Sequence, residues 1–557
     1  MNEFEKLSLE RKRLVSEGEI PSWFTTQGWK MFKSKYQYGD ETVKGAYNRI
    51  ANTLCRHVPG YEDEARDKFF DLMWSGKFGP STPAFTNTGT NRGHSVSCSG
   101  GFIPDSVDGF YKHAHEVAML SKYGYGTSGY LGAIRPRGTP IATGGESDGC
   151  VPVFDTMVDV TKKISQGNNR RGNWAGYIEV DSPDFDEVCG YILKNPAEAH
   201  IGWIFSDLFI ERLKNKDKEA IRRWNRVLYI RSRFGKGYIF KVDTANRLAP
   251  DAIKNSNIPI CMSNLCSEIM LPSNEDYTFS CVLSSLNLAR WDDFDEDTVF
   301  WAIVFLDCLV SDMLEKARGV PGFEKIVRFT EEFRALGLGV MGWHTYLQSK
   351  DIPFDSLEAQ FENAHIFKTI REQAERASVW LAERFGEPKW CKGTGKRNAT
   401  LMAIAPTTSN AFLCGGVSQG IEPLVGNVFN QGVSSGEAYR INPKLIEVLN
   451  KYGKYTDEVI EDIAIHNGSV QHLPYLSDLE KAVLKTAFEI DQFAIIRQAS
   501  QRQERIDQGQ SLNLFFGEDE EYVAAVTKEA LLDPRIKSLY YQRSLRGVKP
   551  VTCTVCE

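Results

Sequence analysis

The segment MSNLCSEIML, residues 262–271, carries an amide, a thiol and a carboxylate at alternate positions. These groups belong to Asn264, Cys266 and Glu268. Residues two apart in an extended strand point to the same face, so a strand here would bring the three side chains together. An orienting amide, a sulfur and a base form a catalytic set. The structural alternative is a half-buried strand that carries polar residues by chance.

Four further cysteines stand out by their surroundings. CVLSSLNLA begins with Cys281, and SVSCSGG contains Cys98 in a glycine- and serine-rich loop, where backbone can approach a ligand closely. Taken singly, each is read more simply as a small buried apolar residue. The sequence ends in PVTCTVCE, in which Cys553 and Cys556 have the C-x-x-C spacing of redox-active pairs.

Two other segments can be interpreted either as functional or as purely structural. APTTSNAF, residues 405–412, places Pro406 before hydroxyl and amide side chains at an expected helix start. Free N–H groups and the helix dipole at such a start favour an anion such as phosphate, and a simple N-cap is the alternative. Tyr540 and Tyr541 in SLYYQRS are, by spacing alone, core aromatics.

Composition limits the classes of function. The chain has 557 residues, a net charge of -7, 42% hydrophobic and 25% charged residues, which fits a globular protein and argues against duplex-DNA binding. The N-terminal residues contain no apolar stretch of a secretory signal, and LGLGVMGW (336–343) is too short to cross a bilayer. Twelve cysteines without such a signal indicate the reducing cytoplasm.

Metal-binding motifs are not recognised in the sequence. A single C-x-x-C would need distant partners to bind zinc, and His113 and His115 are two apart, so on a helix they point in different directions. No H-E-x-x-H or Walker A pattern occurs. We therefore expect no metal in this chain.

The pattern of elements changes along the chain. Residues 1–75 have helical apolar spacing, and residues 76–180 are rich in Gly, Ser, Thr and Asn, which favours a binding site built from loops. Over residues 185–500, helical patterns alternate with short apolar runs. This alternation predicts an α/β architecture, and its length allows a barrel.

Taken together, these segments resemble the large, catalytic subunit of ribonucleotide reductase, most closely the class I type. The resemblance extends in order from about Pro80 to the C-terminus. The matching blocks are STPAFTNTGT…SCSGGFIPDS, SQGNNRRG, SNLCSEI, CVLSSLNL, RALGLGVMGWH, RNATLMAIAPTTSNAF…GIEP, QSLNLF and SLYYQRS. Eight blocks in the family's order exclude chance.

The resemblance implies a ten-stranded α/β barrel with an N-terminal helical domain and a flexible C-terminal tail. The corresponding boundaries are 1–80 for the helical region, 81–545 for the barrel with its specificity loops, and 546–557 for the tail. The residues before the first block look too few for the family's ATP-binding cone. We therefore expect no overall dATP switch, and the compactness suggests a phage or bacterial origin.

The family's mechanism gives the cysteines and their neighbours roles. Cys266 resembles the thiyl radical site that takes the 3′-hydrogen of the ribose. Glu268 resembles the base for the 3′-hydroxyl, and Asn264 the amide that orients it. Cys98 is similar to the thiol that protonates the departing 2′-hydroxyl, with Cys281 as its partner, and the two then form a disulfide.

The resemblance also assigns binding residues. The substrate positions, mostly for a diphosphate, are Thr82, Ser97, Thr408, Ser409 and Asn410. The specificity-site positions for a nucleoside triphosphate effector are Asp105 for its ribose, Arg135 for its phosphate, and Gln166 and Arg170 in the loop that joins effector and substrate. After GTPI the sequence has ATGGE, with one extra residue and without an arginine that some members have, which leaves the choice of effector open.

The resemblance to class I enzymes implies partners. Tyr540 and Tyr541 resemble the pair that relays a radical from a separate, metal-containing, ferritin-like small subunit, so no cofactor is expected in this chain. The C-x-x-C tail resembles the shuttle that passes oxidation to thioredoxin or glutaredoxin, and the family forms homodimers. Nucleic acid and membrane are not expected partners. Two alternatives remain: an adenosylcobalamin-dependent reductase, and a non-catalytic nucleotide-binding or redox-carrier protein that uses the tail.

Overall fold

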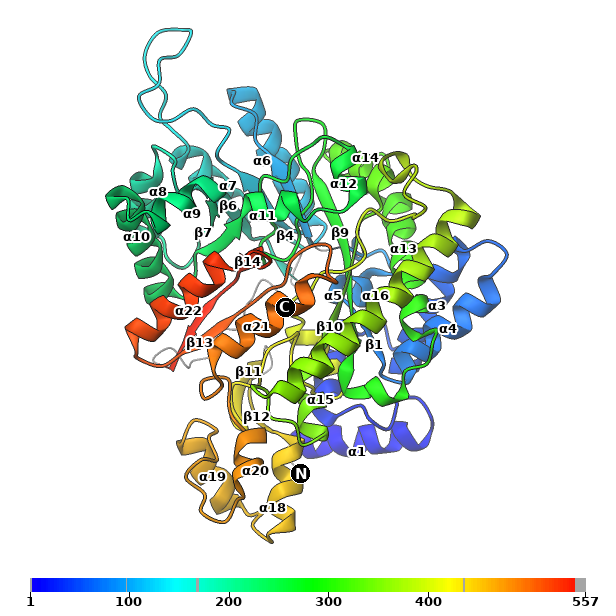
Figure 1. Cartoon of the computed structure of the whole chain (residues 1–557). Coiled ribbons are helices and arrows are strands. Elements are labelled where there is room, and N and C mark those ends of the chain that lie inside the picture. Colours follow the sequence, from blue (N-terminus) through cyan, green and yellow to red (C-terminus); the bar gives the residue numbers. More distant parts are fainter. Residues whose placement is uncertain (1–2, 97, 167–169, 434–435, 546–557) are drawn as a thin grey trace.

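The computed structural model describes residues 3–96, 98–166, 170–433 and 436–545 (Figure 1). Helices at the N-terminus pack beside a large mixed sheet that further helices surround, and a small lobe protrudes at one end. Among the helices of these ranges, none combines the length and apolar character needed to span a bilayer.

The N-terminal part is helical, as predicted. Its elements are α1 (Glu3–Ser16), α2 (Thr26–Met31), the π-helical turn η1 (Phe32–Tyr36), α3 (Val43–Leu54), the 3₁₀ turn η2 (Cys55–His57) and α4 (Glu62–Trp74). The side chain of Thr42 caps α3 by accepting the N–H of Gly45 at 3.2 Å. The apolar residues of α3 recur at helical spacing and are buried, so this helix packs one face against α4 and α13.

Most of the remaining helices surround or cap the sheet, whereas α18, α19 and α20 belong to the small lobe. They are α5 (Thr82–Asn87), α6 (Val107–Lys122), α7 (Val151–Lys163), α8 (Phe185–Lys194), α9 (Asp207–Lys214), α10 (Lys218–Phe234), α11 (Val242–Arg247), α12 (Asp251–Asn255), η3 (Leu288–Asp293), α13 (Thr298–Ala317), α14 (Glu324–Phe333), α15 (Trp343–Ser349), α16 (Leu357–Phe385), η4 (Lys389–Cys391), α17 (Thr408–Leu413), α18 (Pro443–Lys451), α19 (Asp457–Ile465), α20 (Asp478–Val483), α21 (Gln492–Gln503) and α22 (Glu520–Leu532).

Within the described ranges, nine strands form the main sheet, in the order β1-β9-β2-β3-β6-β7-β8-β14, with β10 also paired to β9. They are β1 (Phe78–Pro80), β2 (Cys98–Phe102), β3 (Gly126–Tyr130), β6 (Trp174–Glu179), β7 (His200–Phe205), β8 (Tyr238–Lys241), β9 (Phe279–Asn287), β10 (Leu336–Met341) and β14 (Ser538–Leu539). Strands β2, β3, β6, β7 and β8 are parallel, and β9 is antiparallel to β2 but parallel to β10. Parallel strands joined by helices confirm the predicted α/β class.

Backbone hydrogen bonds continue beyond β10 and close the sheet on itself. The N–H of Ala403 donates to Leu338, that of Ser511 donates to Ile404, and that of Tyr540 donates to Leu512. The segment that contains Tyr540 follows β14, which pairs with β8 at the other end of the sheet. Among the described residues the sheet has nine regular strands rather than the expected ten. Irregular extended segments with isolated bridges close the barrel.

The barrel interior and the outer helical layer have separate apolar cores. The interior cluster contains Cys98, Cys266, Cys281 and the adjacent pair Tyr540 and Tyr541, all of them buried. Outside it, the 20-residue helix α13 is buried on nearly all sides, which its almost uniformly apolar sequence requires. The site residues thus lie within a packed shell rather than on exposed loops.

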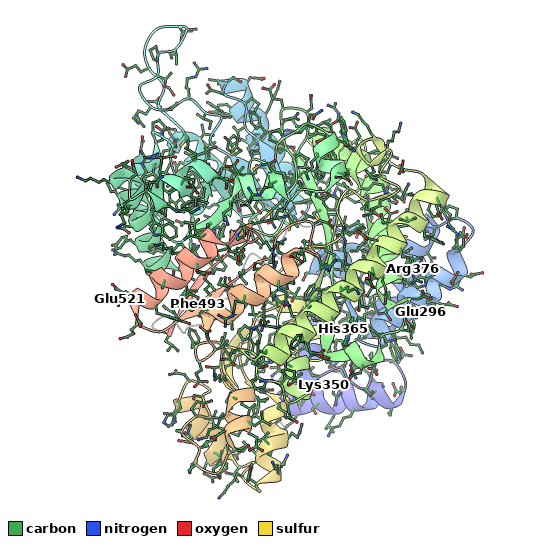
Figure 2. The ribbon with its side chains drawn as sticks, in the orientation of Figure 1. Glu296, Lys350, His365, Arg376, Phe493 and Glu521 are labelled. Atoms are coloured by element: carbon green, nitrogen blue, oxygen red, sulfur yellow. The ribbon has the colours of Figure 1, made fainter. Side chains whose placement is uncertain are left out.

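The 29-residue helix α16 forms part of the outer surface (Figure 2). Ser356 caps its start by accepting the N–H of Ala359 at 3.1 Å. His365 and Arg376 lie on its exposed side, and Arg376 makes an ion pair of 2.7 Å with Asp297. This helix packs its opposite face on α13 and α21.

The small lobe has a core of its own. It is formed by the hairpin β11 (Val428–Val433) and β12 (Gly436–Ile441) together with α18, α19 and α20. Its core is a cluster around Leu445, Leu449, Ile463 and Val470. Figure 1 shows these elements projecting from the end of the molecule opposite α6. Two short pairs complete the strands: β4 (Ser165–Gln166) with β5 (Arg170–Arg171), and β13 (Leu514–Phe516) with β15 (Gln542–Ser544).

Two local predictions are wrong. The segment 262–271 is not a strand, because it turns at Leu265 and Cys266. The SVSCSGG segment is not a loop over its second half, because Cys98–Phe102 forms strand β2. A Cβ on Gly100 would clash with the ring of Phe279, so this glycine permits close strand packing. The predicted domain boundaries stay predictions.

Candidate active site

One pocket opens at the centre of the barrel. Its wall combines thiols, a carboxylate and several hydroxyl groups with apolar side chains. The lining residues are Ser81, Thr82, Pro83, Cys98, Gly126, Leu265, Cys266, Glu268, Leu283, Ser284, Ser285, Ala405, Pro406, Thr407, Ser409 and Asn410. They come from the first residues of β2 and β3, from the middle of β9, from the turn that contains Cys266, and from the starts of α5 and α17 with the residues that precede them.

Asn264 builds the turn that presents the reactive side chains. Its Oδ1 accepts the backbone N–H groups of Glu268 and Ile269, each at 3.0 Å. Ser267 adopts a left-handed conformation with a φ of 62°. The side-chain amide therefore replaces the strand partner that these N–H groups would otherwise need. Asn264, Cys266 and Glu268 therefore belong to one turn and not to the strand that the alternation predicts.

Cys98 and Cys281 face each other across strands. They are directly paired residues of the antiparallel strands β2 and β9. Opposed residues in antiparallel strands have Cα atoms about 4.5–5.5 Å apart, within the range that a disulfide spans. The Nδ2 of Asn264 lies 3.5 Å from Cys98 Sγ, and Gln508 Nε2 donates to Cys281 Sγ at 3.2 Å.

Burial controls protonation at this site. It raises the pKa of Cys281 well above its ordinary value, and the hydrogen bond from Gln508 opposes this effect. Burial also raises the pKa of Glu268 to about 7, against hydrogen bonds from its own backbone N–H, Asn264 and Ser511. Cys281 is thus a protonated thiol near neutral pH. Glu268 can gain or lose a proton there, as a general base must.

The two tyrosines connect the site to the barrel wall. Tyr540 Oη donates to Cys266 Sγ at 3.6 Å, and the rings of Tyr540 and Tyr541 lie 4.0 Å apart. Both rings also contact Tyr238, at 5.1 and 5.7 Å. The guanidinium of Arg543 lies 4.6 Å from the ring of Tyr541. The pair is buried, as the spacing predicts, and it also forms a continuous path to the thiol.

The predicted substrate residues are only partly gathered. Thr82, Ser409 and Asn410 line the pocket, whereas Thr408, the first residue of α17, is not among its lining residues. The Oδ1 of Asn410 is buried and has no hydrogen-bond partner among the described residues, so it can accept a bond from a ligand. Ser97 lies outside the described residues.

The predicted effector residues are described in part. Arg135 Nε donates to Asp105 Oδ2 at 2.6 Å, so these two predicted residues form an ion pair. Gln166 in β4 and Arg170 in β5 are paired backbone positions, and their side chains lie outside the described part of the chain. The same holds for Cys553 and Cys556.

Three buried polar residues were missed by the sequence analysis. Ser511 Oγ lies 3.0 Å from Glu268 Oε2 and 2.7 Å from the carbonyl oxygen of Cys266. Gln508, besides donating to Cys281, accepts the N–H of Met270 at 3.0 Å. Both come from a segment more than 200 residues away along the chain, so no local pattern could have revealed them.

The third missed residue is Glu422, in the GIEP block. Its Oε1 accepts the amide of Asn513 at 2.6 Å, and Asn513 in turn accepts the backbone N–H of Tyr541 at 2.9 Å. Burial raises the pKa of Glu422 to about 7, against the charge of Arg543. The sequence signal that could have revealed Glu422 is that it is a single acidic residue within a mostly apolar segment.

Comparisons with known proteins agree with this geometry. The family model for the ribonucleotide reductase all-alpha domain matches residues 22–93, and that for the barrel domain matches 96–222, 210–394 and 389–542. The Actinobacillus ureae class Id ribonucleotide reductase alpha subunit has a similar structure. Its TM-score is 0.86 at 38% identity, with 94% of this chain and 98% of that chain covered.

Two sequence relatives are similar over nearly their whole length. A Frog virus 3 (isolate Goorha) protein named as a ribonucleoside-diphosphate reductase large subunit is 36% identical over 523 residues, which are 89% of this chain and 91% of the relative. The large subunit from Invertebrate iridescent virus 3 is 29% identical over 604 residues, with 94% of each chain covered. The chain therefore belongs to the ribonucleotide reductase family, as the large, catalytic subunit of a class I-like ribonucleoside-diphosphate reductase.

Proposed function

We propose that Cys266 carries the thiyl radical of this reductase and that Cys98 and Cys281 supply its two electrons. The observation that carries the proposal is one pocket lined by Cys98, Cys266 and Glu268, with Cys281 directly opposite Cys98 on strand β9. Three thiols and a carboxylate whose pKa is about 7 are the groups that this radical chemistry needs.

The proposed cycle begins on the ribose of a nucleoside diphosphate. The Cys266 thiyl radical takes the 3′-hydrogen atom and becomes a thiol, and Glu268 accepts the proton of the 3′-hydroxyl. Asn264 orients the reacting groups. Cys98 donates a proton to the 2′-hydroxyl, which leaves as water, because a radical at the neighbouring carbon makes that departure accessible.

The electron balance closes on the cysteine pair. The C2′–O bond breaks and a C2′–H bond forms, while the two thiols of Cys98 and Cys281 lose two electrons and two protons and form one S–S bond. The 3′-hydrogen returns from Cys266, which restores the radical. Net consumption is one ribonucleotide and two thiols, and net products are one deoxyribonucleotide, one water and one disulfide.

The radical enters from outside this chain. A class I subunit relies on a separate radical-generating subunit, which we propose is a metal-containing, ferritin-like protein. The contact of Tyr540 with Cys266, and of Tyr541 with Tyr540, supports entry along this pair. Glu422 and Arg543 are proposed to set the electrostatic environment of Tyr541. Asn513 links the two, because it donates to the Glu422 carboxyl and accepts the backbone N–H of Tyr541.

Substrate and effector are proposed to bind at the residues that the family resemblance assigns to them. We propose that Thr82, Thr408, Ser409 and Asn410, with Ser97, hold the substrate and chiefly its diphosphate. A nucleoside triphosphate effector is proposed to meet Asp105 and Arg135 at a homodimer interface, with Gln166 and Arg170 in the connecting loop. Coupling between two such sites is typically about 1–3 kcal/mol.

Re-reduction is proposed to use the tail. Cys553 and Cys556 would exchange thiols with the Cys98–Cys281 disulfide and pass the oxidation to thioredoxin or glutaredoxin. The chain contains twelve cysteines, and we propose that it works in a reducing compartment such as the cytoplasm.

The decisive experiment measures deoxynucleotide formation by the purified chain mixed with its small subunit. We expect turnover with the small subunit and no turnover with adenosylcobalamin alone. Turnover with adenosylcobalamin alone would instead indicate the cobalamin-dependent alternative. Cys266→Ser should abolish turnover while nucleotide binding persists. Cys261→Ser is the matched control, because Cys261 is five residues away but does not line the pocket. Full activity of Cys266→Ser would favour the redox-carrier alternative.

A further inference from the structure

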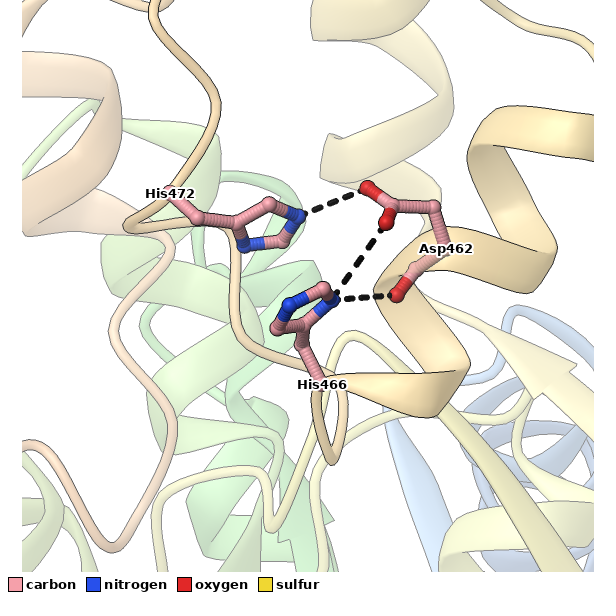
Figure 3. Close-up of side chains that lie close together, drawn as sticks. All are labelled: Asp462, His466 and His472. Carbon is pink, nitrogen blue, oxygen red and sulfur yellow. Dashed lines mark hydrogen bonds and ion pairs between the residues drawn. The ribbon is translucent and has the colours of Figure 1, made fainter.

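A cluster of metal-ligating side chains lies in the small lobe, among residues that the proposed function does not use. Asp462 is in the last turn of α19, His466 follows that helix directly, and His472 lies in the loop beyond it. Figure 3 shows both imidazole rings turned toward the one carboxylate. The spacing, Asp-x₃-His-x₅-His, matches none of the motifs considered in the sequence analysis.

The distances within the cluster fit a single small ion. His472 Nε2 lies 2.7 Å from Asp462 Oδ2, and His466 Nδ1 lies 3.4 Å from Asp462 Oδ1. One ligand atom from each residue lies within 4.8 Å of the other two. Zinc bonds of about 2.0–2.1 Å in tetrahedral geometry place ligand atoms about 3.3 Å apart. Small side-chain movements therefore suffice.

The helix fixes two of the three ligands. Residues four apart on a helix lie on the same face, and the backbone N–H of His466 still bonds to the carbonyl of Asp462 at 3.2 Å. The rings of His466 and His472 stack 3.9 Å apart with an interplanar angle of 22°. The third ligand thus comes from the loop, held against the other two by ring stacking.

The donor set favours zinc over the common hard cations. Two imidazole nitrogens and one carboxylate suit Zn²⁺, whereas Mg²⁺ prefers oxygen donors in octahedral geometry. The side chains are 44%, 47% and 29% exposed for Asp462, His466 and His472, so an ion can reach them and water can complete its coordination.

We propose that Asp462, His466 and His472 bind one Zn²⁺ ion that ties the end of α19 to the loop carrying His472. His466 Nδ1 lies 2.8 Å from the carbonyl oxygen of Asp462, so coordination through this nitrogen moves the ring proton to Nε2. The loop residues Val470 and Leu473 are buried in the lobe core. The ion therefore adds a surface link to a lobe held otherwise by this small apolar cluster.

The test is a zinc titration of the full chain by calorimetry after treatment with EDTA. The tail thiols are themselves zinc ligands, so the parent protein carries Cys553→Ser and Cys556→Ser. We expect one zinc per chain with micromolar or tighter affinity, and no binding of MgCl₂. His466→Ala and His472→Ala should each weaken binding by at least about tenfold, since loss of even outer-shell partners costs about 10- to 100-fold.

Two further variants separate ligand loss from damage to the lobe. His472→Gln can keep a hydrogen bond to Asp462 but supplies a poor zinc ligand, and it should weaken binding as His472→Ala does. His365→Ala, on the exposed side of α16, is the matched control and should leave binding unchanged (Figure 2).

A spectroscopic readout identifies the donor atoms. Co²⁺ in place of zinc should give a visible spectrum without a thiolate charge-transfer band, because the proposed ligands are nitrogen and oxygen. Absence of zinc binding by the parent protein would overturn the proposal and leave a hydrogen-bonded cluster. Unchanged affinity and stoichiometry in a His466→Ala/His472→Ala double variant would overturn it equally.

Discussion

Ser511→Ala tests whether the protonation of Glu268 limits catalysis. The Ser511 hydroxyl has one proton and lies within reach of both Glu268 Oε2, at 3.0 Å, and the carbonyl of Cys266, at 2.7 Å. When Glu268 is ionised, the bond to the charged oxygen is the stronger of the two. Removing the hydroxyl therefore destabilises the carboxylate and leaves the protonated form little affected.

The size of the effect follows from that bond. A hydrogen bond to a charged group contributes about 1.5–3 kcal/mol, and one pKa unit corresponds to about 1.36 kcal/mol, so the pKa of Glu268 should rise by about 1–2 units. Starting from a pKa of about 7, the ionised fraction at pH 7.5 falls from about three quarters to about one quarter or less.

The assay is the pH dependence of kcat/KM with saturating small subunit and a dithiol reductant. If Glu268 must be ionised, the acidic limb of the profile moves to higher pH by about 1–2 units, and activity recovers at high pH. Ser538→Ala is the matched control, because the Ser538 hydroxyl donates to the carbonyl of Ser267 in the same turn at 2.7 Å. An acidic limb that stays in place in Ser511→Ala would refute the base role of Glu268.

Three other predictions concern the same machinery. Tyr540→Phe removes the hydroxyl that contacts Cys266 Sγ, so turnover should fall below detection while substrate affinity, measured by equilibrium dialysis, is kept; measurable turnover would exclude this radical route. Glu268 has a folded-state pKa of about 7 against an ordinary value of about 4.3, so its contribution to stability is complete below about pH 4 and is lost as the pH rises through 7. Glu268→Gln should therefore gain about 3–4 kcal/mol in unfolding free energy relative to the parent between pH 4 and pH 8, and a gain that does not depend on pH would contradict this. Cys553→Ser with Cys556→Ser should complete one turnover and then stall with thioredoxin, while a small dithiol restores multiple turnover; unimpaired turnover with thioredoxin would remove the tail from the cycle.

Regular elements were predictable where one local pattern dominates. Helices such as α3 and α16 follow from apolar spacing and from N-cap residues such as Thr42 and Ser356. The turn that holds Cys266 was not predictable, because its N–H groups bond to the side chain of Asn264 rather than to a strand. Strand-like alternation and a side-chain-stabilised turn look the same in a short segment.

The site residues could be identified from the family resemblance. The residues that hydrogen-bond to them could not be identified in this way. Ser511 and Gln508 reach Glu268 and Cys281 only because the barrel closes through irregular extended segments. Those segments form single bridges rather than strands, so they carry no regular alternation to detect. The closure also explains why fewer regular strands occur than the family resemblance implies.

The most direct test of the central claim is peptide mapping by mass spectrometry after a single turnover. The Cys553→Ser/Cys556→Ser chain is mixed with its small subunit and substrate, without added reductant, and its free thiols are then alkylated. A disulfide between Cys98 and Cys281, in an amount equal to the deoxynucleotide formed, is the predicted result. Deoxynucleotide formation with both thiols still alkylatable, or with a disulfide elsewhere, would contradict the account.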